Sequence, residues 1–265
     1  MDVHRGVQMG IEMKKLSLNR NQVKYLLITA MLIDHIAWAF VPMNTVQGQV
    51  MHFIGRLTGP TMAFFLAEGY LHTRNVPGYA KRLGIFALLS WGPFCFFELG
   101  MLPVTIHTGH VAGLFYFYLS PWDISLAVMP AFGVIYTLLL SLLAIWLLDK
   151  GRCPKWCKIL GIIGLCILSV FGDWPVFDIL YALFFFIFRN NTKKKWIAYS
   201  IISGCTFVFG GISWEGVYQI GVFMVPVLIQ FFYNGESGSK KPVHKWFFYV
   251  FYPAHLLLLG VLAWL

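Results

Sequence analysis

Long apolar runs separated by short polar stretches dominate this 265-residue chain. Most runs have about the 17–25 residues that cross a hydrocarbon core of about 30 Å as a helix. Their apolar positions are continuous and do not alternate, so helices are expected rather than a closed barrel. The pattern predicts an all-α, polytopic transmembrane helical bundle. The nine expected spans are 23–42, 50–72, 80–99, 123–148, 158–172, 174–189, 195–212, 214–233 and 246–265.

One further apolar segment, Val111–Leu119, is too short to cross a bilayer and is interpreted as re-entrant or interfacial. A tenth full span at this place would move the later basic loops to the opposite side of the membrane, so nine spans are favoured. The chain then divides into a tail, residues 1–22, and a single transmembrane domain, residues 23–265. No cleavable signal peptide is expected, because the first apolar run lacks a small-residue cleavage site.

Composition supports the membrane class. Hydrophobic residues make up 58% of the chain and charged residues only 12%, against about 25% charged in soluble domains. All of the 20 Lys and Arg residues except Arg56 fall in the N-terminal tail or in alternate loops. The positive-inside rule therefore predicts a cytoplasmic N-terminus in the cytoplasmic (inner or plasma) membrane. This orientation signal accounts for most of the net charge of +9, so no nucleic-acid partner is expected.

Arg56 lies within an apolar run, and the preceding run carries Asp34 and His35. Charged and titratable groups inside a span are costly and usually mark a functional site. Arg56 shares a helical face with small residues such as Gly59 and Ala63, so it is expected to point into the bundle. Arg56 could instead form a structural ion pair with Asp34 or with Asp178, which is the simpler interpretation.

Further polar residues occur within later spans. Asp178 follows the predicted outer end of its span, while Tyr252 and His255 are three residues apart near the middle of the last span. Glu68 lies in the cytoplasmic half of the second span. The simpler interpretation of His255 is a hydrogen bond to a neighbouring carbonyl. The residues interpreted as solvated or near the outer interface are His52, Glu98, His107, His110, Asp123 and Glu215.

Three sequence blocks resemble the TraX family of membrane proteins. These are Leu32–Ile36, the stretch formed by Ile54–Pro60 with Phe64–Tyr70, and the closing Lys245–Leu256. They occur in the family's order and cover most of the chain. Ser120–Pro130 departs from the family's pattern, which has a threonine-containing helix start there.

The resemblance implies an integral-membrane acyltransferase, similar to wider families that use an acyl-CoA donor and a histidine on an early helix. His35 would be the catalytic histidine, with Asp34 and Arg56 as further catalytic residues. Tyr252 and His255, with Glu68 and Asp178, would line the substrate cavity. Arg74, Lys81 and Arg82 would bind the phosphates of acetyl-CoA, since clustered cations attract anionic ligands.

The chemistry of these residues fits acyl transfer. A neutral imidazole is suited to deprotonating an acceptor, and a desolvated arginine can stabilise an oxyanion. The sequence predicts transfer of an acetyl group to an amine or hydroxyl of an extracytoplasmic or membrane-embedded acceptor. That acceptor could be a peptide N-terminus, a glycan, a lipid head group or a small amine. No metal site is predicted.

Two other functions stay open. A proton-coupled transporter would use Asp34, His35, Arg56 and Asp178 as a relay, although no internal duplication is evident. A non-catalytic assembly subunit would use its aromatic residues, 18% of the chain, only for packing and interface anchoring.

Overall fold

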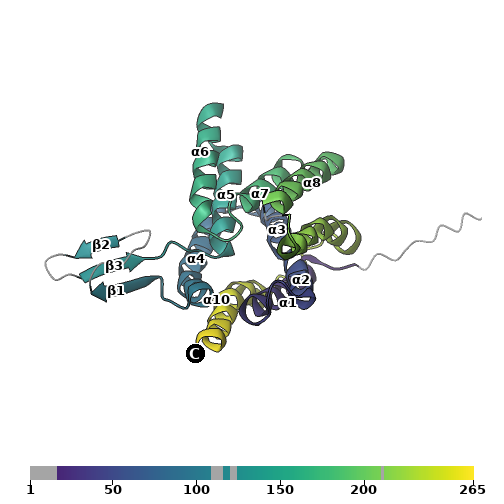
Figure 1. Ribbon diagram of the computed structural model, residues 1–265. Helices are drawn as coiled ribbons and strands as arrows, with labels where there is room; N and C mark the ends of the chain where they lie inside the picture. Colours follow the sequence, from purple (N-terminus) through teal and green to yellow (C-terminus); the bar gives the residue numbers. More distant parts are fainter. Residues whose placement is uncertain (1–16, 109–115, 120–123, 210–211) are drawn as a thin grey trace, which may run out of the picture.

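The computed structural model describes residues 17–108, 116–119, 124–209 and 212–265. Most of these residues are helical (Figure 1). The helices are α1 (Arg20–Phe40), α2 (Val46–Gly55), α3 (Thr58–His72), α4 (Val76–Leu99), α5 (Val134–Lys150), α6 (Lys155–Leu168), α7 (Phe177–Ile187), α8 (Thr192–Phe209), α9 (Val225–Val227) and α10 (Pro242–Trp264). Short 3-10 and π turns are η1 (Ser169–Phe171), η2 (Trp214–Met224) and η3 (Leu228–Phe232).

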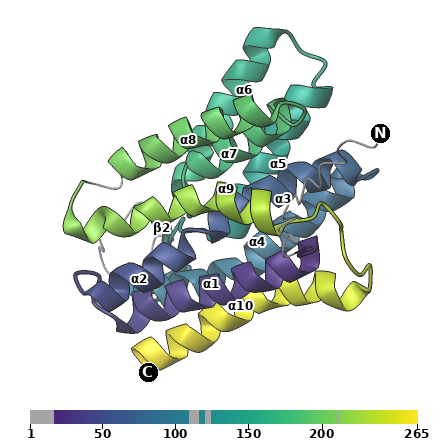
Figure 2. The ribbon, with the colours of Figure 1, turned by 90° about the vertical axis from the view of Figure 1, so that its right-hand side faces the viewer.

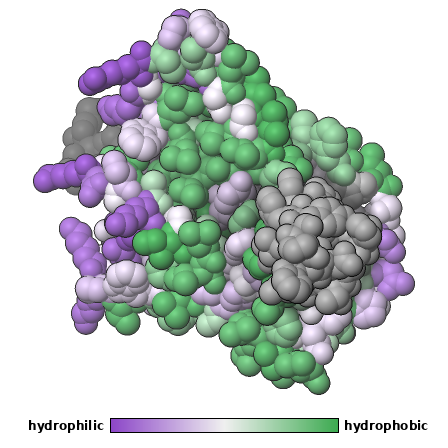
Figure 3. All heavy atoms as spheres, turned by 90° about the vertical axis from the view of Figure 1, so that its left-hand side faces the viewer, coloured by the Kyte–Doolittle hydropathy of each residue, from purple (hydrophilic) through white to green (hydrophobic). Residues whose placement is uncertain are grey.

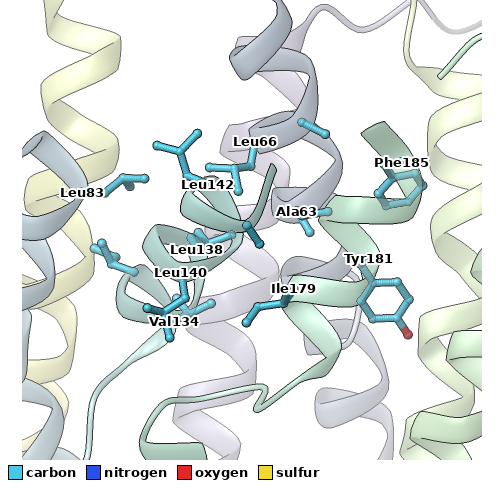
Figure 4. Packing of buried hydrophobic residues seen from close by; sticks show 14 of the residues in the cluster. Ala63, Leu66, Leu83, Val134, Leu138, Leu140, Leu142, Ile179, Tyr181 and Phe185 are labelled. Carbon is cyan, nitrogen blue, oxygen red and sulfur yellow. The ribbon is translucent and has the colours of Figure 1, made fainter. Parts of the chain in front are cut away.

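The helices form a closed ring around α3. Each neighbouring pair is in contact in the order α4, α10, α1, α2, η2, α8, α7 and α5, and α5 returns to α4. Inside this ring α3 packs on α7, α5 and α1, while α6 lies outside on α5 (Figure 1). The main core gathers side chains from α3, α4, α5, α7 and α10, including Leu66, Leu138 and Ile179 (Figure 4).

Proline determines where the second predicted span breaks. Pro60 has no backbone N–H, so the carbonyl of Arg56, four residues earlier, cannot receive the usual helical hydrogen bond. The helix accordingly ends as α2 at Gly55 and resumes as α3 at Thr58. Arg56 therefore lies at a helix break, where its side chain can turn toward α1.

A three-stranded antiparallel sheet projects from the helices (Figure 1). Its strands are β1 (Val104–Thr108), β2 (Tyr116–Leu119) and β3 (Ile124–Val128), and β3 lies in the middle. Val104 pairs with Val128, and Tyr116 pairs with Ala127. The predicted all-α class is therefore incomplete.

The sheet corrects two predictions. Part of the predicted re-entrant segment, Tyr116–Leu119, is the strand β2, while residues 111–115 lie outside the described residues. The predicted span at 123–148 is also wrong at its start, because Ile124–Val128 is a strand and the helix begins only at Val134. Val, Ile and aromatic residues suit strands as well as apolar helices, so hydropathy alone did not separate the two.

Within the described part of the chain, four helical units are long and apolar enough to cross a membrane: α1, α4, Trp214–Phe232 and α10. Helix α7 is apolar but shorter. The protein is therefore a helical membrane protein by length and composition, and the count of nine spans stays a prediction. Helices α1 and α10 lie side by side (Figure 2). Hydrophilic side chains gather along two opposite edges of the molecule, with a broad apolar surface between them (Figure 3).

The first helix begins slightly earlier than the predicted start of the first span at residue 23. Helix α1 begins at Arg20, where Asn19 and Gln22 form a reciprocal N-terminal cap. The backbone N–H of Leu18 donates to the Phe232 carbonyl, and Asn234 donates to Leu18. These bonds hold the start of α1 against η3.

Candidate functional site

Asp34 on α1 is the centre of a buried charge cluster. One carboxylate oxygen accepts from Nδ1 of His52 at 2.7 Å, and the other accepts from the Arg56 guanidinium at 3.0 Å. Asp34 and His52 are 7% and 1% exposed, respectively. Gly55 directly faces the Asp34 side chain, which leaves no room for a Cβ atom there. The absence of a side chain at Gly55 therefore allows α2 to approach α1 closely.

Two aromatic rings enclose the Arg56 guanidinium. Its central carbon lies 4.7 Å from the Trp174 ring centroid and 5.1 Å from that of Tyr218. Arginine stacks on aromatic faces while keeping its N–H groups free for carboxylates. Trp174 and Val176 both have positive φ values, of 56° and 66°, which is uncommon for residues other than glycine. This strained segment places Trp174 against Arg56.

His35 pairs directly with a second histidine. Its Nδ1 lies 2.8 Å from Nε2 of His255 on α10, and Nδ1 of His255 lies 2.9 Å from the Phe251 carbonyl. A carbonyl only accepts, so Nδ1 of His255 carries a hydrogen and its Nε2 accepts. His35 must then donate from Nδ1. The unprotonated nitrogen of His35 is therefore Nε2, and this atom can act as a base.

A cavity of about 540 Å³ contains His35, and we call it the histidine cavity. Asp34, Arg56, Glu98 and Asp173 also line it. Burial raises the pKa of Asp173 to about 6, although the Arg56 charge opposes this and the Asp34 charge adds to it. The cavity thus combines one base, one arginine and three acidic side chains.

A second cavity has a volume of about 340 Å³ and is lined in part by basic side chains. We call it the basic cavity. Its basic lining residues are Arg20, Lys24, Arg82, Lys240, Lys241, His244 and Lys245. Apolar side chains such as Leu27 and Leu138 line its interior, and Tyr252 lies on its wall. The Tyr252 hydroxyl accepts from the Val134 N–H at 3.0 Å.

The two cavities share no lining residue. On α1 the basic cavity includes Met31 and the histidine cavity includes His35. At a rise of about 1.5 Å per residue, these positions are only about 6 Å apart along the helix. The wall between the cavities is therefore about one helical turn thick at α1.

The structure brings together only part of the predicted site. His35, Asp34 and Arg56 line one cavity, and His255 contacts His35. Tyr252 was expected in the same cavity but lines the basic one. Arg82 also lines the basic cavity, whereas its predicted companions Arg74 and Lys81 do not.

Two predicted cavity residues have other partners. Glu68 forms an ion pair with Arg20 at 2.8 Å and accepts from the Tyr233 hydroxyl. Asp178 is fully buried and bonded to Thr137 at 2.7 Å. Neither lines the histidine or the basic cavity. Glu68, on α3, instead links α3 to the start of α1 and to the end of η3 through these two contacts.

Sequence reasoning missed His52 and Glu98. His52 was interpreted as solvated, but it is buried and bonded to Asp34; its spacing of four residues before Arg56 was the available signal, because the two share a helical face. Glu98 was interpreted as an ordinary interfacial residue, but it lines the histidine cavity. Among the described residues, no group of three or more His, Cys, Asp and Glu side chains could hold a metal ion.

The fold and the buried cluster define a helical membrane protein with a polar site enclosed between its helices. Residues 19–263 match the TraX protein family, and the chain belongs to that family. A curated relative in Dichelobacter nodosus, "Probable fimbrial assembly protein FimC, serogroup H1", is 28% identical over 250 residues. The match covers 90% of this chain and 93% of the relative. No solved structure matches the chain.

The ion pair predicts a large effect of Asp34→Asn. Removing the carboxylate charge leaves the Arg56 guanidinium uncompensated. This side chain is only 12% exposed, and the loss of a buried partner typically costs about 3–5 kcal/mol. We expect a clear loss of stability in thermal unfolding of the detergent-solubilised protein. Glu215→Gln removes an exposed carboxylate and is the control, with an expected change below about 1 kcal/mol. Equal unfolding temperatures for the two variants would contradict a structural role for Asp34.

The raised pKa of Asp173 predicts a pH-dependent stability. Its contribution is fully present below the ordinary pKa of 3.8 and is lost as the pH rises through about 6. Asp173→Asn should match the wild type near pH 4 and exceed its stability at pH 7 by about 1–2 kcal/mol, since the carboxyl is partly exposed. If the difference in unfolding free energy between Asp173→Asn and the wild type stayed constant across this pH range, Asp173 would have an ordinary pKa.

Proposed function

We propose that this protein is a membrane-bound acyltransferase. It transfers an acetyl group from acetyl-CoA to an amine or hydroxyl of an extracytoplasmic or membrane-embedded acceptor. The observation that carries the proposal is His35, whose hydrogen bond to His255 makes Nε2 the basic nitrogen in a cavity one helical turn from a second, basic cavity.

The basic cavity fits the donor substrate. Coenzyme A carries anionic phosphates at one end and a thioester on a long, largely uncharged arm. Six Lys and Arg side chains line the cavity, and apolar residues such as Leu27 and Leu138 follow. Clustered cations attract phosphates, and an apolar passage suits the arm. In this arrangement the thioester would approach Tyr252 and the wall beneath His35.

The reaction then needs one base and one leaving group. Nε2 of His35 takes the proton of the acceptor amine or hydroxyl while the acceptor atom attacks the thioester carbonyl carbon. The new C–N or C–O bond forms, the C–S bond breaks, and His35 returns the proton to the coenzyme A sulfur. His255 holds the tautomer of His35 that makes this possible.

Arg56 supplies positive charge to the same cavity. Its guanidinium is paired with Asp34 and stacked between rings, so it is held rigidly. A fixed charge of this kind can stabilise a developing oxyanion. Asp34 and His52 would act by positioning Arg56 rather than by touching the reacting atoms.

Two features bear on the acceptor. Glu98 and Asp173 in the histidine cavity are suited to a positively charged amine. The FimC relative is named a fimbrial assembly protein, which suggests a fimbrial subunit and therefore a peptide N-terminus. A glycan, a lipid head group and a small amine are the other acceptor classes.

The same proposal includes the placement in the membrane. Nine spans in the cytoplasmic membrane, with a cytoplasmic N-terminus, would open the basic cavity to the cytoplasm and the histidine cavity to the outside. The basic mouth then faces the compartment that supplies acetyl-CoA. The carrier alternative is less well supported, because Asp178 contacts Thr137 and does not line the cavity that holds Asp34, His35 and Arg56.

His35→Asn tests the catalytic role. Asparagine can still donate toward His255 but has no basic nitrogen, so acetyl transfer should fall by about 10²–10⁴-fold. The measurement is incorporation of radiolabelled acetyl groups from acetyl-CoA into acceptors of membranes that contain the protein. His72→Asn changes an exposed histidine outside both cavities and should leave labelling unchanged. Wild-type labelling by His35→Asn would refute the mechanism.

Arg82 and Lys81 provide a matched test of donor binding. The two are adjacent on α4, but only Arg82 lines the basic cavity. Coenzyme A should raise the unfolding temperature of the purified wild type. We expect Arg82→Gln to weaken coenzyme A binding about 10-fold, the effect of one lost charge-assisted contact, while Lys81→Gln binds normally. If coenzyme A did not raise the unfolding temperature and function depended on an ion gradient, the proton-coupled transporter would be favoured instead.

A further inference from the structure

An apolar groove between α5 and α6 lies away from both cavities of the proposed site. It has a volume of about 500 Å³ and is lined by Leu143, Trp146, Leu147, Lys150, Gly151, Gly161 and Leu165. Lys150 is its one charged lining residue. The groove therefore combines an apolar slot with a cation at one end, which is the chemistry of a lipid tail and an anionic head group.

The packing of α6 explains why the groove exists. Helix α6 lies outside the ring on α5 and has no fully buried residue (Figure 2). Gly161 of α6 lies against the Leu147 side chain of α5, where an added Cβ would be only 2.6 Å from the Leu147 Cδ2 atom. At Gly164, one turn further, an added Cβ would meet nothing within 4 Å. Gly161 thus permits this contact between the helices, and the groove lies beside it.

Cations gather at the end of the groove marked by Lys150. The Lys150 side chain is 71% exposed and lies 3.4 Å from Asp149, whose charge it partly offsets. Asp149 also accepts from the Tyr70 hydroxyl. Arg152 and Lys155 follow within five residues, are exposed, and form no ion pair with a described residue. Lys158 instead donates to the Leu148 carbonyl. The local charge is therefore positive.

The start of α6 follows the basic stretch directly in the sequence. Its N-cap is Pro154, which gives no side-chain hydrogen bond to the first turn. Uncapped N–H groups at a helix start favour a phosphate. Gly151, which lines the groove, lies only three residues before Pro154. A basic pocket between membrane helices on the cytoplasmic side is suited to an anionic lipid head group, and the cytoplasmic position of this end rests on the membrane placement proposed above.

We propose that this groove binds one anionic phospholipid. An acyl chain lies between Leu143 and Leu165, and the phosphate lies at Lys150, with Arg152 and the start of α6. The inference does not depend on acyltransfer, because no lining residue belongs to the histidine or the basic cavity. The bound lipid would fill the gap between α5 and the weakly packed α6.

Native mass spectrometry tests the proposal on the full chain. The protein is extracted from vesicles containing equal phosphatidylglycerol and phosphatidylcholine, and the retained lipids are identified. A surface cation contributes about 1 kcal/mol per Lys or Arg, or about fivefold. The wild type should therefore retain one phosphatidylglycerol in preference to phosphatidylcholine by about 25-fold. Lys150→Gln with Arg152→Gln should remove this preference.

Two control pairs separate charge from shape. Lys193→Gln with Lys194→Gln removes two exposed cations from another loop and should leave retention unchanged. Leu143→Phe with Leu165→Phe keeps all charges but fills the groove, and should lower retention. Thermal unfolding checks that each variant is folded. Three results would each overturn the proposal. The wild type could retain both lipids equally, or the Lys150/Arg152 and Lys193/Lys194 double variants could lose lipid equally. The third is a lipid-free dimer whose α5–α6 faces cross-link.

Discussion

The rest of the site depends on the buried pairing of Arg56 with Asp34. A charge in the middle of an apolar bundle is tolerated only with a partner, and here the partner comes from the neighbouring helix. The pair fixes α2 against α1, and Gly55 allows the close approach. Because His35 follows Asp34 on α1, anchoring Asp34 also determines which way the His35 ring points, toward α10.

Proline and aromatic residues make this pairing possible. Pro60 interrupts the helix at the point where Arg56 must leave it, and the Trp174 and Tyr218 rings both lie against the guanidinium. Trp174 comes from a segment with strained backbone. Strain of this kind persists only where the surroundings stabilise it, and here the cation–π contact and the Gly59 surface provide that support.

The helical class and the inward direction of Arg56 could be predicted from the sequence. An ion pair of Arg56 with Asp34 or Asp178 could also be predicted, and the structure shows Asp34 as the partner. These features depend on local hydropathy and on the cost of a lone charge in lipid. The spacing of His52 before Arg56 placed both on one helical face, but the bond of His52 to Asp34 also depends on the angle at which α2 returns past α1. Asp178 was expected near the same site, but depth along a helix does not specify direction around it, and this side chain faces Thr137. The sheet was missed because its strands are as apolar as a short helix.

The thin wall between the two cavities has a consequence for the energy stored across a membrane. A group-transfer protein that opens to both sides must let a small acyl group be reached from either side without conducting ions. One elementary charge crossing 100 mV dissipates about 2.3 kcal/mol. The wall is apolar at Met31 and Val134, and Tyr252 is tied to the backbone there. If the protein transfers acyl groups as proposed, an opening through this wall that admitted ions would be a leak, so the wall would also protect the membrane potential.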